Sequence, residues 1–389
     1  MTLRISLLAI TALILTGCAH EPGQSSPEAV PKFVATPVVQ PPCPTWPSPP
    51  SSFLETRGTR YNRAQTLAWL DAEHFALGRW DGSVAVYRDC TEPGCPEPRQ
   101  LLLPPSGQGV QMLQKLDSDE FVTSNGPSSL AIWRKVNGRY ELLSTASYHE
   151  SFGPLRSAAS IQIEQNQLLA AGTHSGHLLV WRRSGDQLRL ENAIDLRSSN
   201  PIPTEICPPP KDITSLLAWT DGRLIAGSED GDITVIDALS GTVQLRKQYN
   251  DKAKRGINSL SLHDDLLLLA NCSVGSEDKN LWLFKLSDTA IEQVDSVNLI
   301  HDQGNTQVFN FSAVLVPRAD GVLFFASTQE GLLWFGEATA AKLDVFPDPV
   351  RVAVEGGAVL MPSFSNDVLA AAAHAVRTFQ IPMQWPGAF

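Results

Sequence analysis

Residues 227–236 read GSEDGDITVI, and this short stretch decides the fold. An apolar run ends at the small residue Gly227, the polar pair Asp230-Gly231 follows, and a second apolar run ends at Ile236. An Asp-Gly pair between two apolar runs is typical of a tight β-hairpin, because its turn needs positive φ angles. The stretch therefore predicts two antiparallel strands joined by a short turn.

The same pattern occurs seven times along the 389-residue chain, at intervals of 43 to 55 residues. The small residues that close the first run are Gly78, Ser124, Gly172, Gly227, Ser273, Ser327 and Ala370. A large side chain follows nine residues later in five units, and eleven residues later in the fifth: Tyr87, Trp133, Trp181, Ile236, Phe284 and Phe379. A repeat of this length with several strands and no helical pattern indicates a β-propeller.

The last unit is short of one strand, which predicts how the ring closes. Only eight residues follow Ile381, whereas residues 52–60 precede the first unit and have no blade of their own. We expect residues 52–60 to pair as the outermost strand of the last blade, because closure removes an exposed sheet edge. One point stays open: residues 351–355 form either an outer strand of the sixth blade or part of a connection.

Residues 52–389 resemble a seven-bladed β-propeller of the WD40 or quinoprotein-like group. The resemblance rests on residues 78–87 (GRWDGSVAVY), 172–181 (GTHSGHLLVW) and 227–236. It implies an all-β domain in which the recurring small residues stand where neighbouring blades crowd together. The Trp-Asp pair that names WD40 repeats is absent from the ends of the third strands, and the Gly-His signature of these repeats is lacking too. The resemblance therefore implies the fold and names no partner.

The N-terminal residues resemble the export signal of bacterial lipoproteins. Arg4 precedes an apolar stretch over residues 5–16, which is too short to span a bilayer, and residues 15–18 read LTGC, as in a lipobox. The resemblance implies that residues 1–17 form a cleaved signal peptide and that Cys18 receives the lipid, diacylglycerol and palmitate. Ala19 after the cysteine is similar to the outer-membrane choice of Gram-negative lipoproteins, which predicts an anchor facing the periplasm.

Residues 18–51 are expected to form a tether. Ten prolines lie in this segment, and such a composition favours extended polyproline II geometry over helix or inner strand. A proline-rich docking motif is the alternative. The formal net charge of −11 and the absence of a basic stripe argue against a nucleic-acid partner.

The cysteines predict one disulfide. Cys90 and Cys95 lie across a short loop of the first blade, and exported proteins meet an oxidising compartment. No second pair follows at a metal-ligand spacing, which weakens the zinc alternative. The pairing of Cys207 and Cys272 stays open, and Cys43 is left over.

Several patterns imitate catalytic or metal sites without the context that those sites need. Ser276 and Lys279 have the Ser-x-x-Lys spacing, His174 and His177 could face zinc, and residues 229–232 carry calcium-like carboxylates. All three lie in the polar turn slot of the repeat, where Asp, Gly and Ser are expected anyway. We therefore expect no catalytic residue, metal or cofactor.

A partner is expected on the face that carries the turns between second and third strands and the connections between blades. The long Pro-rich connection over residues 198–212 falls there. A Trp beside an Arg in a polar turn is a typical protein-contact anchor, although packing over its own blade is equally compatible. The candidate contact residues are Arg79, Trp80, Asp81, Asn125, His174, Glu229, Asp230 and Lys279.

The function that these observations favour is a non-enzymatic lipoprotein whose propeller binds a protein in a periplasmic envelope assembly. A propeller enzyme, either a quinone-dependent dehydrogenase or a lactonase-like hydrolase, is the first alternative. It would need charged or aromatic groups near the axis, where the first strands offer mostly Ser, Leu, Ile and Asn. Glycan or peptidoglycan binding through turn aromatics is the second alternative.

Overall fold

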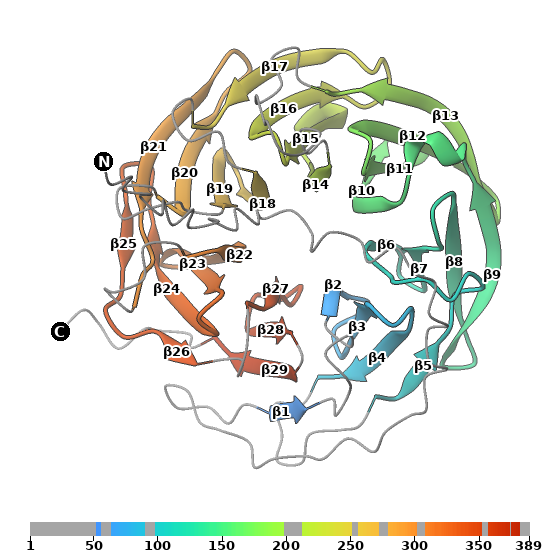
Figure 1. The fold of residues 1–389 in the computed structure, drawn as a ribbon, viewed down its shortest axis with the longest axis horizontal. Helices are drawn as coiled ribbons and strands as arrows, with labels where there is room; N and C mark the ends of the chain where they lie inside the picture. Colours follow the sequence, from blue (N-terminus) through green and yellow to red (C-terminus); the bar gives the residue numbers. More distant parts are fainter. Residues whose placement is uncertain are drawn as a thin grey trace, which may run out of the picture.

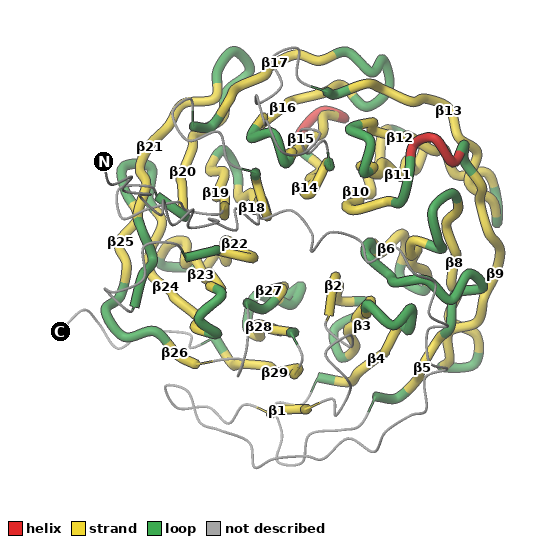
Figure 2. Tube along the Cα trace, in the orientation of Figure 1, coloured by secondary structure: helices red, strands yellow, loops and turns green. Residues whose placement is uncertain are grey.

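The computed structural model describes residues 52–55, 64–89, 98–197, 212–250, 256–271, 279–301, 308–351, 357–373 and 375–381. These residues form a ring of seven antiparallel sheets around a central axis (Figure 1). Strands dominate, and the helical content of this part of the chain is two single-turn 3-10 helices (Figure 2). The predicted all-β, seven-bladed propeller is confirmed.

Each blade runs from an inner strand next to the axis to an outer strand at the rim (Figure 1). In chain order the strands of blades 1 to 4 are β2 (Ala64–Trp69), β3 (His74–Arg79), β4 (Val84–Arg88), β5 (Gln100–Leu102); β6 (Leu113–Asp117), β7 (Glu120–Ser124), β8 (Ser129–Val136), β9 (Arg139–Ser147); β10 (Leu155–Ile163), β11 (Asn166–Thr173), β12 (His177–Ser184), β13 (Gln187–Asp195); and β14 (Ile213–Ala218), β15 (Arg223–Ser228), β16 (Asp232–Asp237), β17 (Val243–Gln248). Those of blades 5 to 7 are β18 (Ile257–His263), β19 (Leu266–Asn271), β20 (Leu281–Leu286), β21 (Ile291–Val297); β22 (Asn310–Arg318), β23 (Gly321–Thr328), β24 (Leu332–Ala338), β25 (Leu343–Val345), β26 (Val350–Arg351); and β27 (Val359–Pro362), β28 (Val368–Ala372), β29 (Ala375–Gln380), β1 (Ser52–Glu55). The 3-10 helices are η1 (Glu150–Phe152) and η2 (Thr220–Gly222).

The first of the described strands closes the ring. Strand β1 pairs antiparallel with β29, the last of the described strands, with Ser52 opposite Thr378 and Glu55 opposite Ala375. Figure 1 shows β1 at the rim of the last blade. The predicted closure is confirmed, and both strand edges that an open ring would expose are thereby paired.

The outer edge of the sixth blade is divided between two short strands. β25 pairs with one end of β24, and β26 pairs with the other end, where Arg351 lies opposite Leu332. The alternative left open by the sequence is thus answered for residues 350–351, which belong to the blade edge. Residues 352–356 lie outside the described part of the chain.

The apolar core is distributed over seven seams, one between each pair of neighbouring blades. A methyl group added at Gly172 would lie 2.5 Å from Ile213, the first residue of β14 in the next blade. Gly78 meets Val110 at 2.6 Å and Gly227 meets Ile257 at 2.9 Å in the same way. The small residues of the repeat stand where blades crowd together, as expected.

Serine side chains link the inner strands of neighbouring blades. The hydroxyl of Ser215 accepts the backbone N–H of Leu260 at 3.0 Å, and the hydroxyl of Ser259 accepts that of Ala313 at 2.9 Å. Ser261 and Ser312 make equivalent bonds at 2.8 and 3.2 Å. Inner strands of different blades share no sheet, so these bonds satisfy backbone groups that would otherwise lack partners. The inner serines therefore serve ring closure.

Several predictions concern residues outside the described part of the chain. These are the signal peptide over residues 1–17, the lipidated Cys18, the linker over residues 18–51, and the Cys90–Cys95 disulfide, together with Cys43, Cys207 and Cys272. They stay predictions. Within the described residues, the search for a helix long and apolar enough to cross a bilayer finds none.

Candidate functional site

The turns that follow the second strands lie on one face of the ring, together with the connections between blades. In blade 3 the N–H of His174 donates to the carbonyl of Pro154, in the segment that enters this blade, at 3.0 Å. In blade 4 the N–H of Glu229 donates to the carbonyl of Asp212 at 2.9 Å, and blade 6 repeats the bond from Gln329. We call this surface the turn face; the other end of the ring is the opposite face.

Equivalent positions on the turn face carry different side chains. The residue two places after the small residue is Trp80 in blade 1, His174 in blade 3, Glu229 in blade 4 and Gln329 in blade 6. The backbone fixes these positions, whereas their chemistry differs from blade to blade. The turn face therefore presents an aromatic ring, an imidazole, a carboxylate and an amide at related places around one rim.

Blade 1 presents Trp80 from a rigid turn. The Trp80 side chain is 41% exposed, whereas Arg79 is 3% exposed and donates a hydrogen bond to the Tyr87 hydroxyl. The carboxylate of Asp81 accepts the N–H and the hydroxyl of Ser83 at 2.9 and 2.6 Å. Arg79 and Asp81 thus stabilise the turn, and Trp80 is the side chain that the turn offers to solvent.

Asn125 and Lys279 occupy structural positions in blades 2 and 5. The buried Asn125 side chain accepts the N–H of Ser106 at 2.8 Å and donates to the Ser129 hydroxyl at 2.8 Å. It thereby holds the turn of blade 2 against the connection from blade 1. The Lys279 carbonyl accepts the indole N–H of Trp282 at 3.2 Å at the start of β20. Their contact with a partner stays a prediction.

His174 joins three blades through a polar cluster. Its Nδ1 lies 2.9 Å from a carboxylate oxygen of Asp212, and its Nε2 lies 2.9 Å from the side-chain oxygen of Gln111. Arg156, on the inner strand β10, places its Nε 3.3 Å from the same Asp212 oxygen. Sequence reasoning identified His174 but missed Arg156 and Gln111, because residues so far apart in the chain give no local signal.

Glu229 lies beside this cluster and has a raised pKa. The residue is 8% exposed, and among the described residues its carboxylate makes no hydrogen bond or ion pair. Burial and the nearby carboxylates of Asp212 and Asp230 raise the pKa of Glu229 to about 7, against the opposing charge of Arg156. The adjacent Asp230 is buried and accepts the Ser228 hydroxyl. Near neutral pH, Glu229 is therefore only partly ionised.

The described residues hold no group of three or more His, Cys, Asp or Glu side chains arranged to bind a metal ion. His177 turns to the Ser175 hydroxyl, which lies 2.8 Å from its Nδ1. His174, as described above, faces Asp212 and Gln111. The two imidazoles thus have separate oxygen partners within the polar turn.

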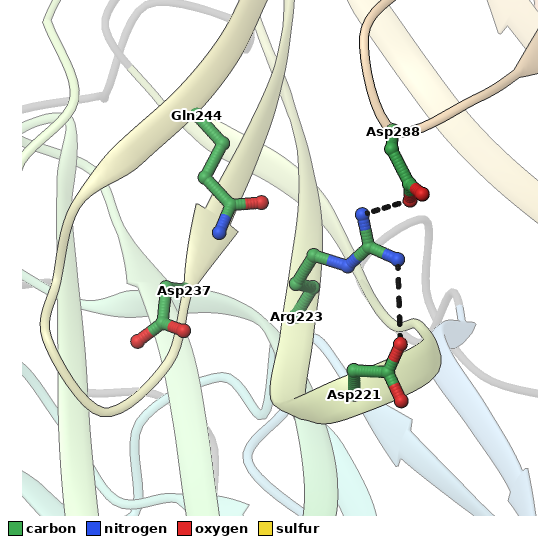
Figure 3. Close-up of a pocket in the computed structure, with 5 residues that line it drawn as sticks. All are labelled: Asp221, Arg223, Asp237, Gln244 and Asp288. Carbon is green, nitrogen blue, oxygen red and sulfur yellow. Dashed lines mark hydrogen bonds and ion pairs between the residues drawn. The ribbon is translucent and has the colours of Figure 1, made fainter.

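A recess on the opposite face is lined by Asp221, Arg223, Asp237, Gln244 and Asp288 (Figure 3). Arg223 lies between two acidic side chains, with an Nη atom 2.9 Å from Asp288 and the other 3.8 Å from Asp221. Its guanidinium also lies over the Trp219 ring, 3.9 Å from the ring centre. Asp288 belongs to blade 5, so Arg223 links two blades at this recess.

Three solved structures share this architecture at low sequence identity. The β-propeller domain of Cps50 (Swd1) from Myceliophteria thermophila has a TM-score of 0.59 and 14% identity, over 85% of this chain and 100% of that one. The fold is a WD40-like β-propeller. A chain of the mitotic checkpoint complex gives a TM-score of 0.61 at 14% identity, over 90% of this chain and 97% of the other. U3-55K gives 0.63 at 13% identity, over 85% and 98%.

No known protein-family profile matches the chain, and no curated protein sequence does. The WD40-like propeller is thus established by its three-dimensional form. At these identities the similarity concerns the fold alone. Function has to be argued from the residues of the turn face.

Proposed function

We propose that this chain is a non-enzymatic, lipid-anchored outer-membrane protein whose WD40-like propeller binds a protein partner of a periplasmic envelope assembly through the turn face. The observation that carries the docking role is the set of different side chains at equivalent positions of that face. Trp80, His174 and Glu229 stand on turns held by hydrogen bonds to neighbouring segments. A rigid surface of varied chemistry suits protein recognition, because little side-chain order is lost on binding.

Trp80 is the anchor of the proposed contact. Tryptophan is enriched among residues that dominate protein interfaces, since it buries a large apolar area and keeps one polar handle. At 41% exposure, Trp80 combines a solvent-accessible surface with a turn fixed by Asp81. The similar fold found in a structure of the mitotic checkpoint complex supports the idea that this architecture can serve within an assembly.

Photocrosslinking in cells tests which face docks. A photoreactive amino acid at position 80 probes the turn face, and one at position 288 is a matched probe of the opposite face. We expect a discrete protein adduct from position 80 and a much weaker one from position 288. Crosslinks confined to position 288, or equal adducts from both positions, would contradict docking through the turn face.

The membrane anchor is tested independently at Cys18. The LTGC sequence at residues 15–18 is the reason for placing the lipid there. We expect mass spectrometry of the mature N-terminus to begin at an acylated Cys18, and Cys18→Ala to abolish palmitate labelling. Cys43→Ala is the control and should retain the label. An unmodified N-terminus would refute the anchor without affecting the docking surface.

A further inference from the structure

The turn face contains a largely buried carboxylate, Glu229, that no described residue compensates with an ion pair. Asp212 is satisfied by Arg156 and His174, at 3.3 and 2.9 Å. Glu229, whose backbone is bonded to Asp212, has no hydrogen bond or ion pair for its carboxylate within the described chain. Its residue is 92% removed from solvent. Buried carboxylates without a partner are costly and rare, so Glu229 calls for an explanation.

The surroundings of Glu229 can be described group by group. Asp212, at the entry to β14, and Asp230, in the same turn, are negative; Arg156, on β10, is positive. His174, on the β11–β12 turn, contacts the same Asp212 carboxylate oxygen as Arg156. Gly256, which precedes β18, lies against the Glu229 backbone with no side chain of its own. Among the described residues, two carboxylates and one guanidinium thus act on Glu229.

A carboxylate in this position can be neutralised by a proton or by a bound cation. A calcium ion takes six to eight oxygen ligands, and the described residues offer no group of three or more metal-binding side chains. The guanidinium of Arg156 would also repel it. An ammonium or guanidinium group needs fewer fixed ligands and forms charge-assisted hydrogen bonds with one or two carboxylates. The geometry therefore favours an organic cation.

We propose that Glu229, together with Asp212, forms a subsite on the turn face that receives a lysine or arginine side chain from the partner protein. This inference rests on the proposed docking function and specifies its chemistry. Trp80 supplies an apolar anchor on the same rim, and Glu229 supplies the charged contact. The cation pairs with a carboxylate that the described residues leave without an ion pair.

The subsite has a characteristic pH dependence. A cation binds the ionised carboxylate, so binding competes with protonation of a group whose pKa is about 7. The apparent affinity is expected to be about tenfold weaker at pH 6 than at pH 8.

The test uses small cationic probes on the full chain in detergent. N-acetyl-arginine amide and N-acetyl-lysine amide carry the charge, and N-acetyl-citrulline amide is the neutral isostere of the arginine probe. Saturation-transfer NMR reports the binding of each. We expect transfer to both charged probes and at least fivefold less to the citrulline probe, with the charged probes binding about tenfold more weakly at pH 6.

Three variants make the result specific. Glu229→Gln should reduce the signal from the charged probes at least fivefold and remove its pH dependence. Glu330→Gln changes the equivalent turn of blade 6 and should leave binding unchanged. Arg156→Gln removes the competing positive charge and, measured at pH 9 where Glu229 stays ionised, should tighten binding of the charged probes about threefold or more. A gain of binding cannot come from misfolding, so Arg156→Gln keeps the test valid if Glu229→Gln is poorly folded.

The inference is overturned if the citrulline probe binds as well as the charged probes, if Glu229→Gln retains binding, or if calcium alone binds in their place. Failure here is distinct from failure of the docking function. Adducts from position 80 without probe binding would remove the cation subsite and keep the docking face. Probe binding with crosslinks only from position 288 would remove the docking face and leave a cation site without its proposed role.

Discussion

Two glutamates, Glu120 and Glu229, are buried to almost the same extent but have neighbours of opposite charge. Glu120 on β7 is 7% exposed and Glu229 is 8% exposed. Glu120 pairs with Arg134 at 2.6 Å and also with Arg183 of the next blade. Burial raises the pKa of Glu120, but hydrogen bonds from the two arginines outweigh it and hold the pKa below its usual range. For Glu229, burial and like charges act together and raise the pKa.

The difference separates a structural carboxylate from one available for binding. Glu120 lies beside the β6–β7 turn, on the opposite face, and its contact with Arg183 ties blade 2 to blade 3. Removing one partner of a buried ion pair strands the other, so such a pair is hard to alter. Within the described part of the chain, Glu229 forms no ion pair of this kind. Glutamate therefore links two blades at one face of the ring and lacks a described ion-pair partner at the other.

The largest change in the free energy of unfolding is expected for a substitution at Glu120. Glu120→Gln removes the charge that compensates two arginines, and we expect the free energy of unfolding to fall by about 3 to 5 kcal/mol. Chemical denaturation at pH 7 measures this change. A loss below about 1 kcal/mol would show that the arginines find other partners and that the contrast between the two glutamates is overstated.

Glu229→Gln should instead raise the free energy of unfolding. The pKa of Glu229 rises from 4.5 to about 7 on folding, so the folded state binds more protons between these values and stability falls as pH rises through them. Glutamine does not ionise, so the variant does not lose this stability as the pH rises. We expect a gain of about 2 to 3 kcal/mol at pH 8 and almost none at pH 4, measured by denaturation across this range. Parallel pH profiles for the two proteins would contradict the raised pKa.

A smaller effect is expected from Asp212. Asp212→Asn removes a negative charge beside Glu229 and frees Arg156, so the pKa of Glu229 should fall by roughly one pH unit. Carboxyl-carbon NMR of the labelled protein measures it. Asp221→Asn, on the opposite face, is the control and should leave this pKa unchanged. An unchanged value in Asp212→Asn would assign the raised pKa to burial alone.

The smallest effect is expected at Asp186. Its carboxylate, 59% exposed, pairs with Arg134 on the solvent side of the Glu120 network. Asp186→Asn should leave the free energy of unfolding almost unchanged, because exposed ion pairs contribute little. The same denaturation assay measures it. A loss as large as that of Glu120→Gln would mean that the network acts as one unit.

The fold could be predicted from the sequence because each blade repeats the same local pattern of residues. Small residues such as Gly172 and apolar runs recur at a regular spacing, and the missing outer strand predicted the role of β1. The inner serines were visible, but their bonds to neighbouring blades depend on how the blades are placed. The same holds for the site. His174 and Glu229 were found as turn residues, whereas their contacts with Arg156 and Asp212 arise between segments distant in the chain.

Which turn residues reach solvent was equally beyond the sequence. Arg79 and Trp80 are neighbours in one polar turn, yet the first points to the Tyr87 hydroxyl and the second is exposed. Both were reasonable contact candidates. Burial at such a turn depends on the position of the next blade, which a pattern of residue types along one segment does not report.

The pairing of β1 with β29 has a consequence for synthesis. The strand made first waits for a partner made more than 300 residues later, and closing so long a loop is entropically costly and slow. Until then, the nascent chain keeps an unpaired edge at each end, and such edges recruit other chains. Folding of the last blade thus waits for synthesis of β29, since only a chain that includes this strand can pair β1.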